Sequence, residues 1–231
     1  MKQISIAIPT YEMHGEGVQV LEFSFEKMKQ QTFKNFDVVI SDHSSNDDIL
    51  NLCEKWKNDL DIKYFKNEED KGSPSANTTS AIKKSTGKWI KILCQDDFLY
   101  NQYSLERIYD FLDEKTVWMA SSYMHSYDRK TFFKYQNPSM NEHICVVNTI
   151  GTPSCITIRN VKDIPEFDKE LFYAYDCAWY HELWKKYGNP KILQETTMIN
   201  FLWNNSISSK ITPEFIQKEN EYILRKYGFL K

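Results

Sequence analysis

Two adjacent carboxylates, Asp96 and Asp97, directly follow an apolar run over residues 88–94. A short run rich in Ile and Trp after a glycine is typical of a buried strand. Carboxylate oxygens are the ligands that Mg²⁺ and Mn²⁺ prefer, and a loop at the carboxyl end of a strand presents them to a cleft. The structural alternative is a turn or a helix cap. The pair therefore predicts a divalent-cation site or a turn, and the neighbouring elements must decide between them.

The first hundred residues alternate between strand and helix patterns. Strands are expected over 3–8, 36–41, 61–66 and from 88 onward, with a helix between each pair. Ser73-Pro74 predicts the start of the third helix, which is expected to run to about Thr86 and to end at Gly87. This order requires right-handed crossovers, and so a mostly parallel central sheet with helices on both faces.

Ligands of such sheets bind beyond the carboxyl ends of the strands. Asp42 follows the second expected strand and is therefore expected on the same rim as Asp96 and Asp97. Three carboxylates on one rim favour a binding site over an isolated turn.

The second half of the chain shows weaker and more mixed patterns. Helices are expected over 104–112, 176–187 and 213–227, and strands over 117–135 with a turn at 128–130, over 156–159 and over 198–203. Residues 137–149 match neither pattern. We expect a smaller antiparallel part that continues the same α/β domain.

Composition excludes several classes of function. The 231 residues carry a formal net charge of −3 with both signs mixed along the chain, so no nucleic-acid partner is expected. The five cysteines include no C-x-x-C pair and are expected to be reduced thiols of a cytoplasmic protein. The N-terminal apolar stretch is too short for a signal peptide, and no apolar run is long enough to span a membrane.

Three segments resemble, in their order and spacing, the family 2 inverting glycosyltransferases of the GT-A fold: "ISIAIPTYE", "FDVVISDHSSNDD" and "NEEDKGSPSANTTSAIKKSTGKWIKILCQDD". A later segment, "FDKELFYAYDCAWYHELWKKYG", resembles the family's helix with the catalytic acid. The resemblance implies a single GT-A-type, Rossmann-like domain over 1–231. Residues 1–100 would form its nucleotide-sugar-binding half, and residues 101–231 its acceptor-binding and catalytic-base half.

The resemblance also implies roles for individual residues. Asp176 would be the general base, and Asp97 would ligate Mg²⁺ or Mn²⁺ on the donor diphosphate. Asp96 would contact the ribose or the metal shell. Asp42 would accept a hydrogen bond from uracil N3–H, and Tyr11 would stack on the base. The other expected nucleotide contacts are Pro9, Thr10, Glu12, Lys71, Asn77 and Gln95.

The sequence departs from the family pattern at several positions. Cys94 replaces the first acid of an Asp-x-Asp-Asp motif, which leaves open whether Asp96 ligates the metal with Asp97. Ala76 replaces an Arg for which Lys71 is a possible substitute. His43 stands where Gly is usual, and Tyr175 stands where Glu is frequent.

Two structural alternatives stay open for the assigned carboxylates. Asp42 followed by Ser44 also fits an Asx-turn, and Asp176 also fits the N-cap of the helix that follows.

The expected chemistry is consistent with the resemblance. A metal clamp stabilises the charge that develops on a leaving nucleoside diphosphate, and a positioned carboxylate takes the proton of the attacking hydroxyl. The expected function is inverting transfer of a sugar from a nucleotide donor, UDP-linked, to a glycan or lipid-linked acceptor in polysaccharide synthesis. The alternatives are a non-catalytic nucleotide-sugar or glycan-binding module and a sugar-nucleotide pyrophosphorylase. A pyrophosphorylase needs a Gly-rich, Arg-containing loop after the first strand, and the segment "PTYEMHGEG" is not such a loop.

The C-terminal segment combines apolar and basic residues at helical spacing. A basic amphipathic helix of this kind either packs against its domain or rests on an anionic membrane surface, so peripheral membrane contact is an open alternative. The residues concerned are Phe215, Ile216, Lys218, Ile223, Arg225, Lys226, Tyr227, Leu230 and Lys231.

Overall fold

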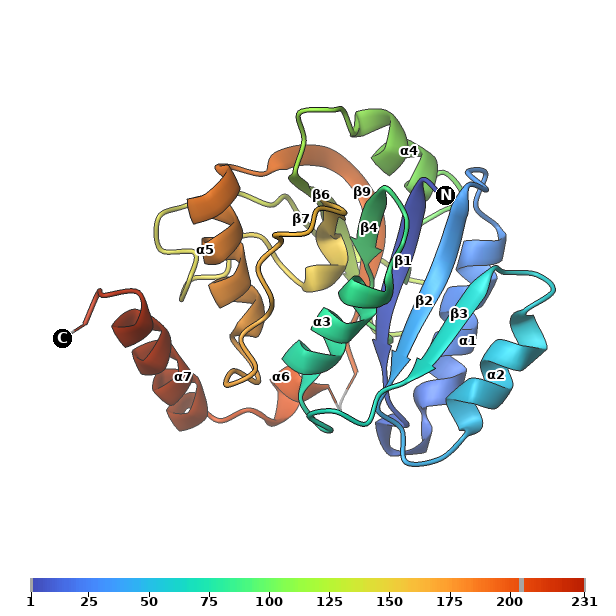
Figure 1. The fold of residues 1–231 in the computed structure, drawn as a ribbon, viewed down its shortest axis with the longest axis horizontal. Coiled ribbons are helices and arrows are strands. Elements are labelled where there is room, and N and C mark those ends of the chain that lie inside the picture. Colours follow the sequence, from blue (N-terminus) through green and yellow to red (C-terminus); the bar gives the residue numbers. More distant parts are fainter. Residues whose placement is uncertain (1, 204–205, 231) are drawn as a thin grey trace.

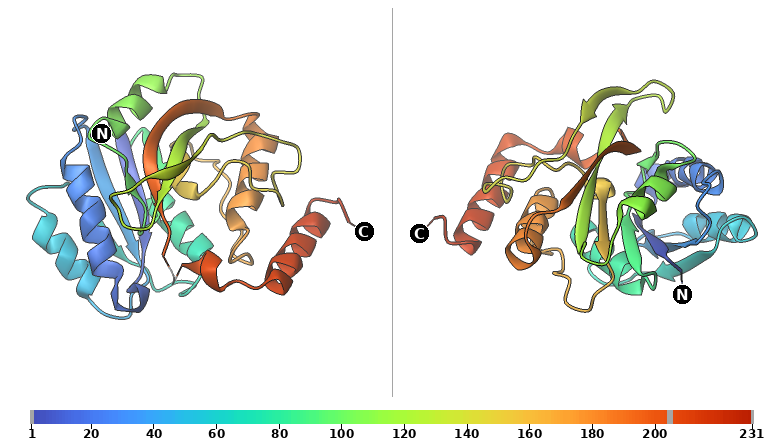
Figure 2. Two further views of the ribbon diagram at one scale, coloured as in Figure 1. Left: turned by 180° about the vertical axis from the view of Figure 1, so that it is seen from behind. Right: turned by 90° about the horizontal axis from the view of Figure 1, so that it is seen from above.

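The computed structural model describes residues 2–203 and 206–230, and this part of the chain forms one nine-stranded sheet covered by helices on both faces (Figures 1 and 2). The strand order is β3-β2-β1-β4-β8-β6-β9-β5, with β7 paired to β6. The first four strands, β1 (Ile4–Thr10), β2 (Phe36–Asp42), β3 (Ile62–Lys66) and β4 (Trp89–Ile92), are parallel. The others are β5 (Phe98–Leu99), β6 (Trp118–Ser126), β7 (Phe133–Gln136), β8 (Ile156–Arg159) and β9 (Lys191–Phe201).

The second half of the sheet mixes directions. Strand β8 is antiparallel to both β4 and β6, whereas β6 and β9 run parallel, and β5 and β7 add antiparallel edges. The expectation of a single α/β domain with a parallel first half and a smaller antiparallel part is therefore confirmed.

Alternating side chains along the strands explain the two helical layers. Ile4, Ile6 and Ile8 of β1 pack against α1 (Gly17–Lys29), α2 (Asp48–Trp56) and α4 (Ser104–Phe111). Ala7 faces the opposite layer, which contains α3 (Pro74–Lys84) and α5 (Tyr175–Tyr187). All four side chains are fully buried, and burial of each isoleucine stabilises the fold by roughly 1.5–3 kcal/mol. Two short 3₁₀ helices, η1 (Met13–Gly15) and η2 (Pro153–Cys155), lie at the strand ends.

Helix α7 (Pro213–Lys226) lies at the end of the molecule remote from β3 and α2 (Figure 1). Helix α6 (Ile207–Lys210) is followed by α7, which packs beside α5 through the fully buried side chain of Ile223. Phe215 and Tyr222 remain exposed on α7, and Lys231 lies outside the described residues. Among the described residues, none of the helices has the length and apolar character needed to cross a bilayer.

Two boundaries differ from the sequence-based expectation. Strand β9 begins at Lys191 rather than near 198, because exposed Gln194 and Glu195 interrupt its apolar pattern. Helix α3 ends at Lys84, so Gly87 is not its stop. A Cβ on Gly87 would lie 2.6 Å from the backbone nitrogen of Ser5, so the glycine permits a close approach to β1 instead.

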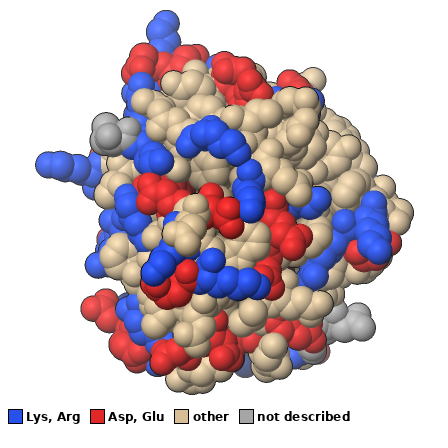
Figure 3. All heavy atoms as spheres, turned by 90° about the vertical axis from the view of Figure 1, so that its right-hand side faces the viewer, with Lys and Arg blue, Asp and Glu red and all other residues tan. Residues whose placement is uncertain are grey.

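The face around α2 and β3 carries both signs of charge (Figure 3). Ion pairs there join Lys29 to Asp59 over 2.8 Å and Lys57 to Glu54 over 2.6 Å, and all four side chains are exposed. Exposed pairs of this kind contribute at most about 1 kcal/mol each. The face shown therefore lacks a continuous surface of one sign.

Candidate active site

A cavity of about 940 Å³ opens at the carboxyl ends of β1 and β4 and extends toward the beginning of α5 and α7. This volume suits a substrate-sized ligand. Both halves of the chain contribute to its wall. Of the residues expected at the site, those lining the cavity are Pro9, Tyr11, Glu12, Lys71, Asn77, Gln95, Asp96, Asp97 and Asp176.

The acidic pair lies in the turn between β4 and β5. Asp97 is 1% exposed, and its Oδ1 accepts hydrogen bonds from Asn200 Nδ2 and from the Phe201 amide, both at 3.0 Å. Asp96 is partly exposed, and its Oδ2 accepts one bond from Trp203 Nε1, also at 3.0 Å. The end of β9 therefore fixes both carboxylates and leaves part of their oxygen surface toward the cavity.

Burial of two neighbouring carboxylates raises the pKa of both. For Asp97, burial and the charge on Asp96 raise the pKa to about 7. Burial raises the pKa of Asp96 as well. The buried ammonium of Lys91, which donates to the Ser154 carbonyl, lies close enough to offset part of this negative charge. A second cation on the cavity side would stabilise the pair further.

The pair is also compatible with a hard divalent cation. Mg²⁺ is commonly bound by one or two carboxylates, with water and substrate phosphates completing its octahedron. The partly exposed carboxylate of Asp96, with Asp97 buried beside it on the cavity wall, could supply such oxygens. Across 2–203 and 206–230, no three His, Cys, Asp or Glu side chains cluster in a way that could hold a metal alone. A cation here would therefore need ligands from the substrate.

Asp176 lies in the first turn of α5, on the cavity wall. Its Oδ1 accepts from the Cys177 amide over 2.7 Å, and its Oδ2 accepts from Asn148 Nδ2 over 2.9 Å. Burial raises the pKa of this carboxyl to about 6, although both hydrogen bonds oppose the shift. The N-cap of α5 is Ala174, so the alternative that Asp176 is the N-cap residue is wrong.

One loop holds carboxylates from both sides of the cavity. Asn148, at its start, binds Asp176, and Thr152, at its end, donates to Asp97 Oδ2 over 3.3 Å. Asn148 is fixed in turn because its Oδ1 accepts from the amides of Ile150 and Gly151. The relative placement of the two carboxylates therefore depends on residues 148–152.

Gln95 lines the cavity, yet its amide is used inside the protein. Its Oε1 accepts from the Tyr11 amide over 2.9 Å, and its Nε2 donates to the carbonyls of Tyr11 and Gly17, both over 3.0 Å. Gln95 thus clamps the chain after β1 and presents the Tyr11 ring, which is 37% exposed, to the cavity.

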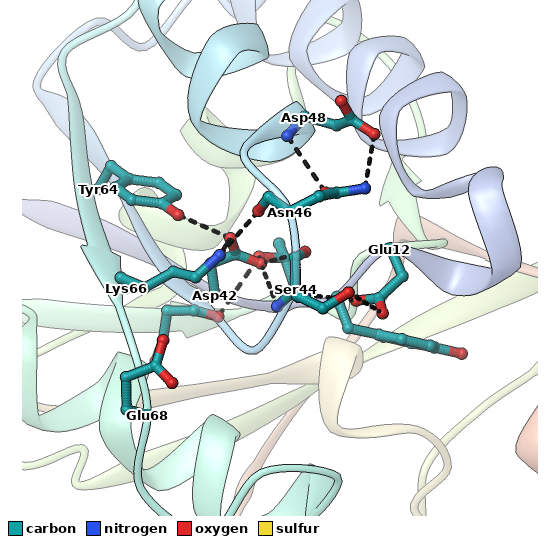
Figure 4. Close-up of polar contacts among 12 residues, drawn as sticks. Glu12, Asp42, Ser44, Asn46, Asp48, Tyr64, Lys66 and Glu68 are labelled. Atoms are coloured by element: carbon teal, nitrogen blue, oxygen red, sulfur yellow. Dashed lines mark hydrogen bonds and ion pairs between the residues drawn. The ribbon is translucent and has the colours of Figure 1, made fainter.

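Asp42 and Thr10, which were expected to contact the nucleotide, do not line the cavity. Figure 4 shows Asp42 among the polar side chains that surround it, with Ser44, Tyr64 and Lys66 close by. Asp42 is fully buried, and its Oδ1 accepts from Thr10 Oγ1 and from both the amide and the hydroxyl of Ser44. Its Oδ2 accepts from Tyr64 over 2.7 Å and lies 3.5 Å from Lys66 Nζ. The bond from the Ser44 amide to Asp42 Oδ1 is that of an Asx-turn, so this alternative describes the arrangement at the end of β2.

The other expected nucleotide contacts differ in how free their polar groups are. The Asn77 amide is occupied, since it donates to the Thr10 carbonyl and accepts from Ser41 and Asn67. Glu12 accepts from Ser45 at the cavity edge. Lys71 lies on the rim and pairs with exposed Glu68 over 2.7 Å.

Sequence reasoning missed five residues that hold the assigned carboxylates or the loop beside them: Asn148, Thr152, Asn200, Trp203 and Glu219. They lie far along the chain from the groups they bind, in segments without a recognisable motif. The segment 200–205, which holds three Asn and one Trp, was the one local signal in the sequence.

Comparison with known proteins identifies the fold and the family. The solved structure of TarS from Staphylococcus aureus in complex with UDP-GlcNAc superposes with a TM-score of 0.72 at 22% identity, covering 98% of this chain and 66% of that one. A mannosyltransferase from Pyrobaculum calidifontis, solved with GDP-Man and Mn²⁺, gives 0.63 at 11% identity, covering 86% and 56%. These likenesses show the GT-A fold.

Similarity to curated relatives points to the same family. The Escherichia coli UDP-Glc:α-D-GlcNAc-diphosphoundecaprenol β-1,3-glucosyltransferase WfaP is 30% identical over 99% of this chain and 88% of its own length. For other curated relatives the chain spans only 17% to 40% of their length. The model of glycosyl transferase family 2 matches residues 5–184. The chain therefore belongs to glycosyltransferase family 2.

Proposed function

We propose that this chain transfers a sugar, with inversion, from a UDP-sugar to a hydroxyl of a lipid-linked glycan. The observation that carries the proposal is the arrangement of two acidic groups around one cavity. Asp176 lies at the start of α5 and the Asp96–Asp97 pair at the end of β4, and the loop over 148–152 binds both. Asp176 suits proton transfer, and the Asp96–Asp97 pair suits a cation bound to a diphosphate.

The nucleotide would lie at the β1 end of the cavity. The half-exposed ring of Tyr11 offers a face for the base, Pro9 adds an apolar wall, and Lys71 offers a positive charge at the rim. The donor in the name of the Escherichia coli relative is UDP-glucose, and the TarS structure holds UDP-GlcNAc. Both support a uridine nucleotide.

Asp96 and Asp97 would hold Mg²⁺ or Mn²⁺ together with the donor diphosphate. When bound, the cation stabilises the negative charge that develops on the leaving phosphate. The hydrogen bonds from Asn200, Phe201 and Trp203 keep the two carboxylates facing the same space. The Pyrobaculum mannosyltransferase was solved in complex with Mn²⁺, which supports this choice of cofactor.

Asp176 would act as the general base. The acceptor oxygen attacks C1 of the donor sugar, the bond from C1 to the diphosphate breaks, and the hydroxyl proton passes to the Asp176 carboxylate. A pKa of about 6 leaves this carboxylate largely ionised at neutral pH and still basic enough to take the proton. A single attack from the face opposite the leaving group inverts the anomeric centre.

The acceptor would enter from the α6–α7 side. Val146, Phe172, Ile211 and Ile216 line that part of the cavity and give it apolar character. An acceptor attached to a lipid diphosphate, as in the name of the Escherichia coli relative, suits such a wall. We infer synthesis of a surface polysaccharide by a cytoplasmic enzyme bound peripherally at the inner face of the membrane.

The test is a transfer assay with UDP-glucose, UDP-GlcNAc and GDP-mannose against GlcNAc-diphosphoundecaprenol, with the product linkage read by NMR. We expect turnover with a UDP-sugar, dependent on Mn²⁺ or Mg²⁺, and a β-linked product from an α-linked donor. If the chain binds a UDP-sugar but neither transfers the sugar nor hydrolyses the donor in a metal-dependent way, the non-catalytic module is favoured. An α-linked product would contradict inversion.

A further inference from the structure

The loop that leads into α5 is held by a carboxylate from a different helix. Three consecutive backbone amides, those of Phe172, Tyr173 and Ala174, donate to the side chain of Glu219 on α7. The distances are 2.6 Å to Oε1 from Phe172, 3.0 Å to Oε2 from Tyr173 and 2.7 Å to Oε2 from Ala174. Glu219 is 7% exposed, so this is a buried anion satisfied by backbone donors.

The arrangement meets a specific need of α5. Its N-cap residue, Ala174, has no side chain that can cap the helix, and no side-chain cap bond is present. A carboxylate at this end of a helix interacts favourably with the positive end of the macrodipole, and hydrogen bonds donated to an ionised acceptor are about twice as strong as those between neutral groups. Glu219 does not replace the missing cap, which would accept from an amide inside the first turn, but it fixes the three residues directly before that turn.

The anchored amides are part of the cavity wall. Phe172, Tyr173 and Ala174 all line the cavity, and Asp176 follows Ala174 by two residues. The direction of the Asp176 side chain depends on where the first turn of α5 begins. A shift of the loop would move the carboxylate relative to Asn148, which donates a hydrogen bond to it.

Packing couples the same loop to α7. Ile223, one helical turn beyond Glu219, is fully buried in a small cluster with Leu171, Ala174 and Ala178. Ile223 and Glu219 thus lie on the same face of α7, one making apolar contacts and the other binding backbone amides. This separates two roles that α7 can have, docking onto the domain and positioning the loop.

We propose that Glu219 is a positioning residue for sugar transfer. It holds residues 172–174 in the conformation that sets the Asp176 carboxylate for proton transfer. The inference rests on the proposed function of Asp176 as the base. It also gives α7 a role in catalysis besides any contact of its exposed surface with a membrane.

The test compares Glu219→Gln with Glu221→Gln and Ile223→Ala. Glu219→Gln keeps the shape but turns an acceptor into an NH₂ group that faces backbone donors. Glu221→Gln removes the same charge from a partly exposed position on the same helix, where the carboxylate contacts only Gln217 and Arg225 of α7 among the described residues. Ile223→Ala weakens docking of α7 without removing a bond to the loop.

We expect Glu219→Gln to lower kcat about 10-fold or more, with the dissociation constant for UDP-sugar within about 2-fold of wild type. Glu221→Gln is expected to keep wild-type kcat. Ile223→Ala is expected to lower Tm at least as much as Glu219→Gln, but to lower kcat less than about 3-fold at a temperature where all variants are folded. Hydrogen exchange at the amides of 172–174 should accelerate in Glu219→Gln and not in Glu221→Gln.

Wild-type kcat in Glu219→Gln would overturn the positioning role, and so would a loss of donor affinity as large as the loss of kcat. An equal loss of kcat in Ile223→Ala would overturn it too, because docking alone would then explain the effect. Absence of transfer by the wild-type chain with every donor would instead contradict the proposed function itself.

Discussion

The side-chain amide of Asn148 donates a hydrogen bond to Asp176 Oδ2 over 2.9 Å. Burial raises the pKa of the Asp176 carboxyl to about 6, and the bond from Asn148 opposes this shift. Because a general base is active only when ionised, the rate should rise with pH through about 6 and level off above it. From the proposed role of Asp176 as the base, we therefore expect the Asn148 side chain to help set the pH range of activity.

Replacement of Asn148 by Asp tests this relationship. In Asn148→Asp one oxygen can still accept from the amides of Ile150 and Gly151, but the donor to Asp176 becomes a second carboxylate. We expect the acid limb of the kcat–pH profile to move upward by about one pH unit or more, since each unit corresponds to about 1.4 kcal/mol. Profiles measured over pH 5 to 9 check this.

The matched control is Asn141→Asp, which introduces the same charge nearby, where the amide bonds to Thr149 rather than to a carboxylate. This variant should keep the wild-type profile. An unmoved acid limb in Asn148→Asp would mean that the titrating base is another group.

Donor binding should depend on a divalent cation. Without one, Asp96 and Asp97 repel each other and the donor diphosphate, so we expect UDP affinity to fall at least about 10-fold in EDTA and in Asp97→Asn. Titration calorimetry of UDP with and without Mn²⁺ measures this. Asp110→Asn serves as the control, because Asp110 is an acid on α4 that does not line the cavity. Equal affinities with and without metal would refute a metal-bridged diphosphate.

Asp42 should stabilise the fold rather than select the base. Asp42→Ala leaves the buried donors of Ser44 and the partly buried hydroxyl of Tyr64 without this acceptor, at roughly 1–3 kcal/mol for each unsatisfied group, and leaves Thr10 Oγ1 only the longer bond to the Ser41 carbonyl. We expect a loss of at least about 2 kcal/mol in the free energy of unfolding, with the preference for uridine over other nucleosides retained. Denaturant unfolding and nucleotide competition measure the two effects. A variant of normal stability that no longer prefers uridine would restore the direct contact with uracil N3–H.

The sequence predicted the first half of the fold well because its signals are local. The runs predicted over 3–8, 36–41 and from 88 onward became the parallel strands β1, β2 and β4, and Ser73 became the N-cap of α3 with its side chain accepting from the Ala76 amide. Turn and cap residues act within a few positions, so their effects can be read from one segment.

The environment of the site could not be predicted in the same way. Gln95 was expected to bind nucleotide but clamps Tyr11, which lies 84 residues earlier. Glu219 lies 45 residues beyond Ala174, the amide it accepts from. Such pairings depend on the tertiary placement of α7 and of the chain after β1, for which no local pattern exists. Burial raises the pKa of Asp176, and this burial likewise depends on tertiary packing rather than on the local sequence.

Turnover of Asp176→Asn, on a donor and acceptor that the wild-type chain uses, tests the central claim most directly. The amide keeps the shape of the side chain and an oxygen for the Cys177 amide, but it cannot take a proton. We predict that kcat falls by roughly 10²-fold or more in this variant, while Tm and donor affinity stay close to wild type. The control is Glu170→Gln, which changes an exposed neighbouring acid and should stay fully active. Near-normal turnover of Asp176→Asn would contradict the account and place the base elsewhere.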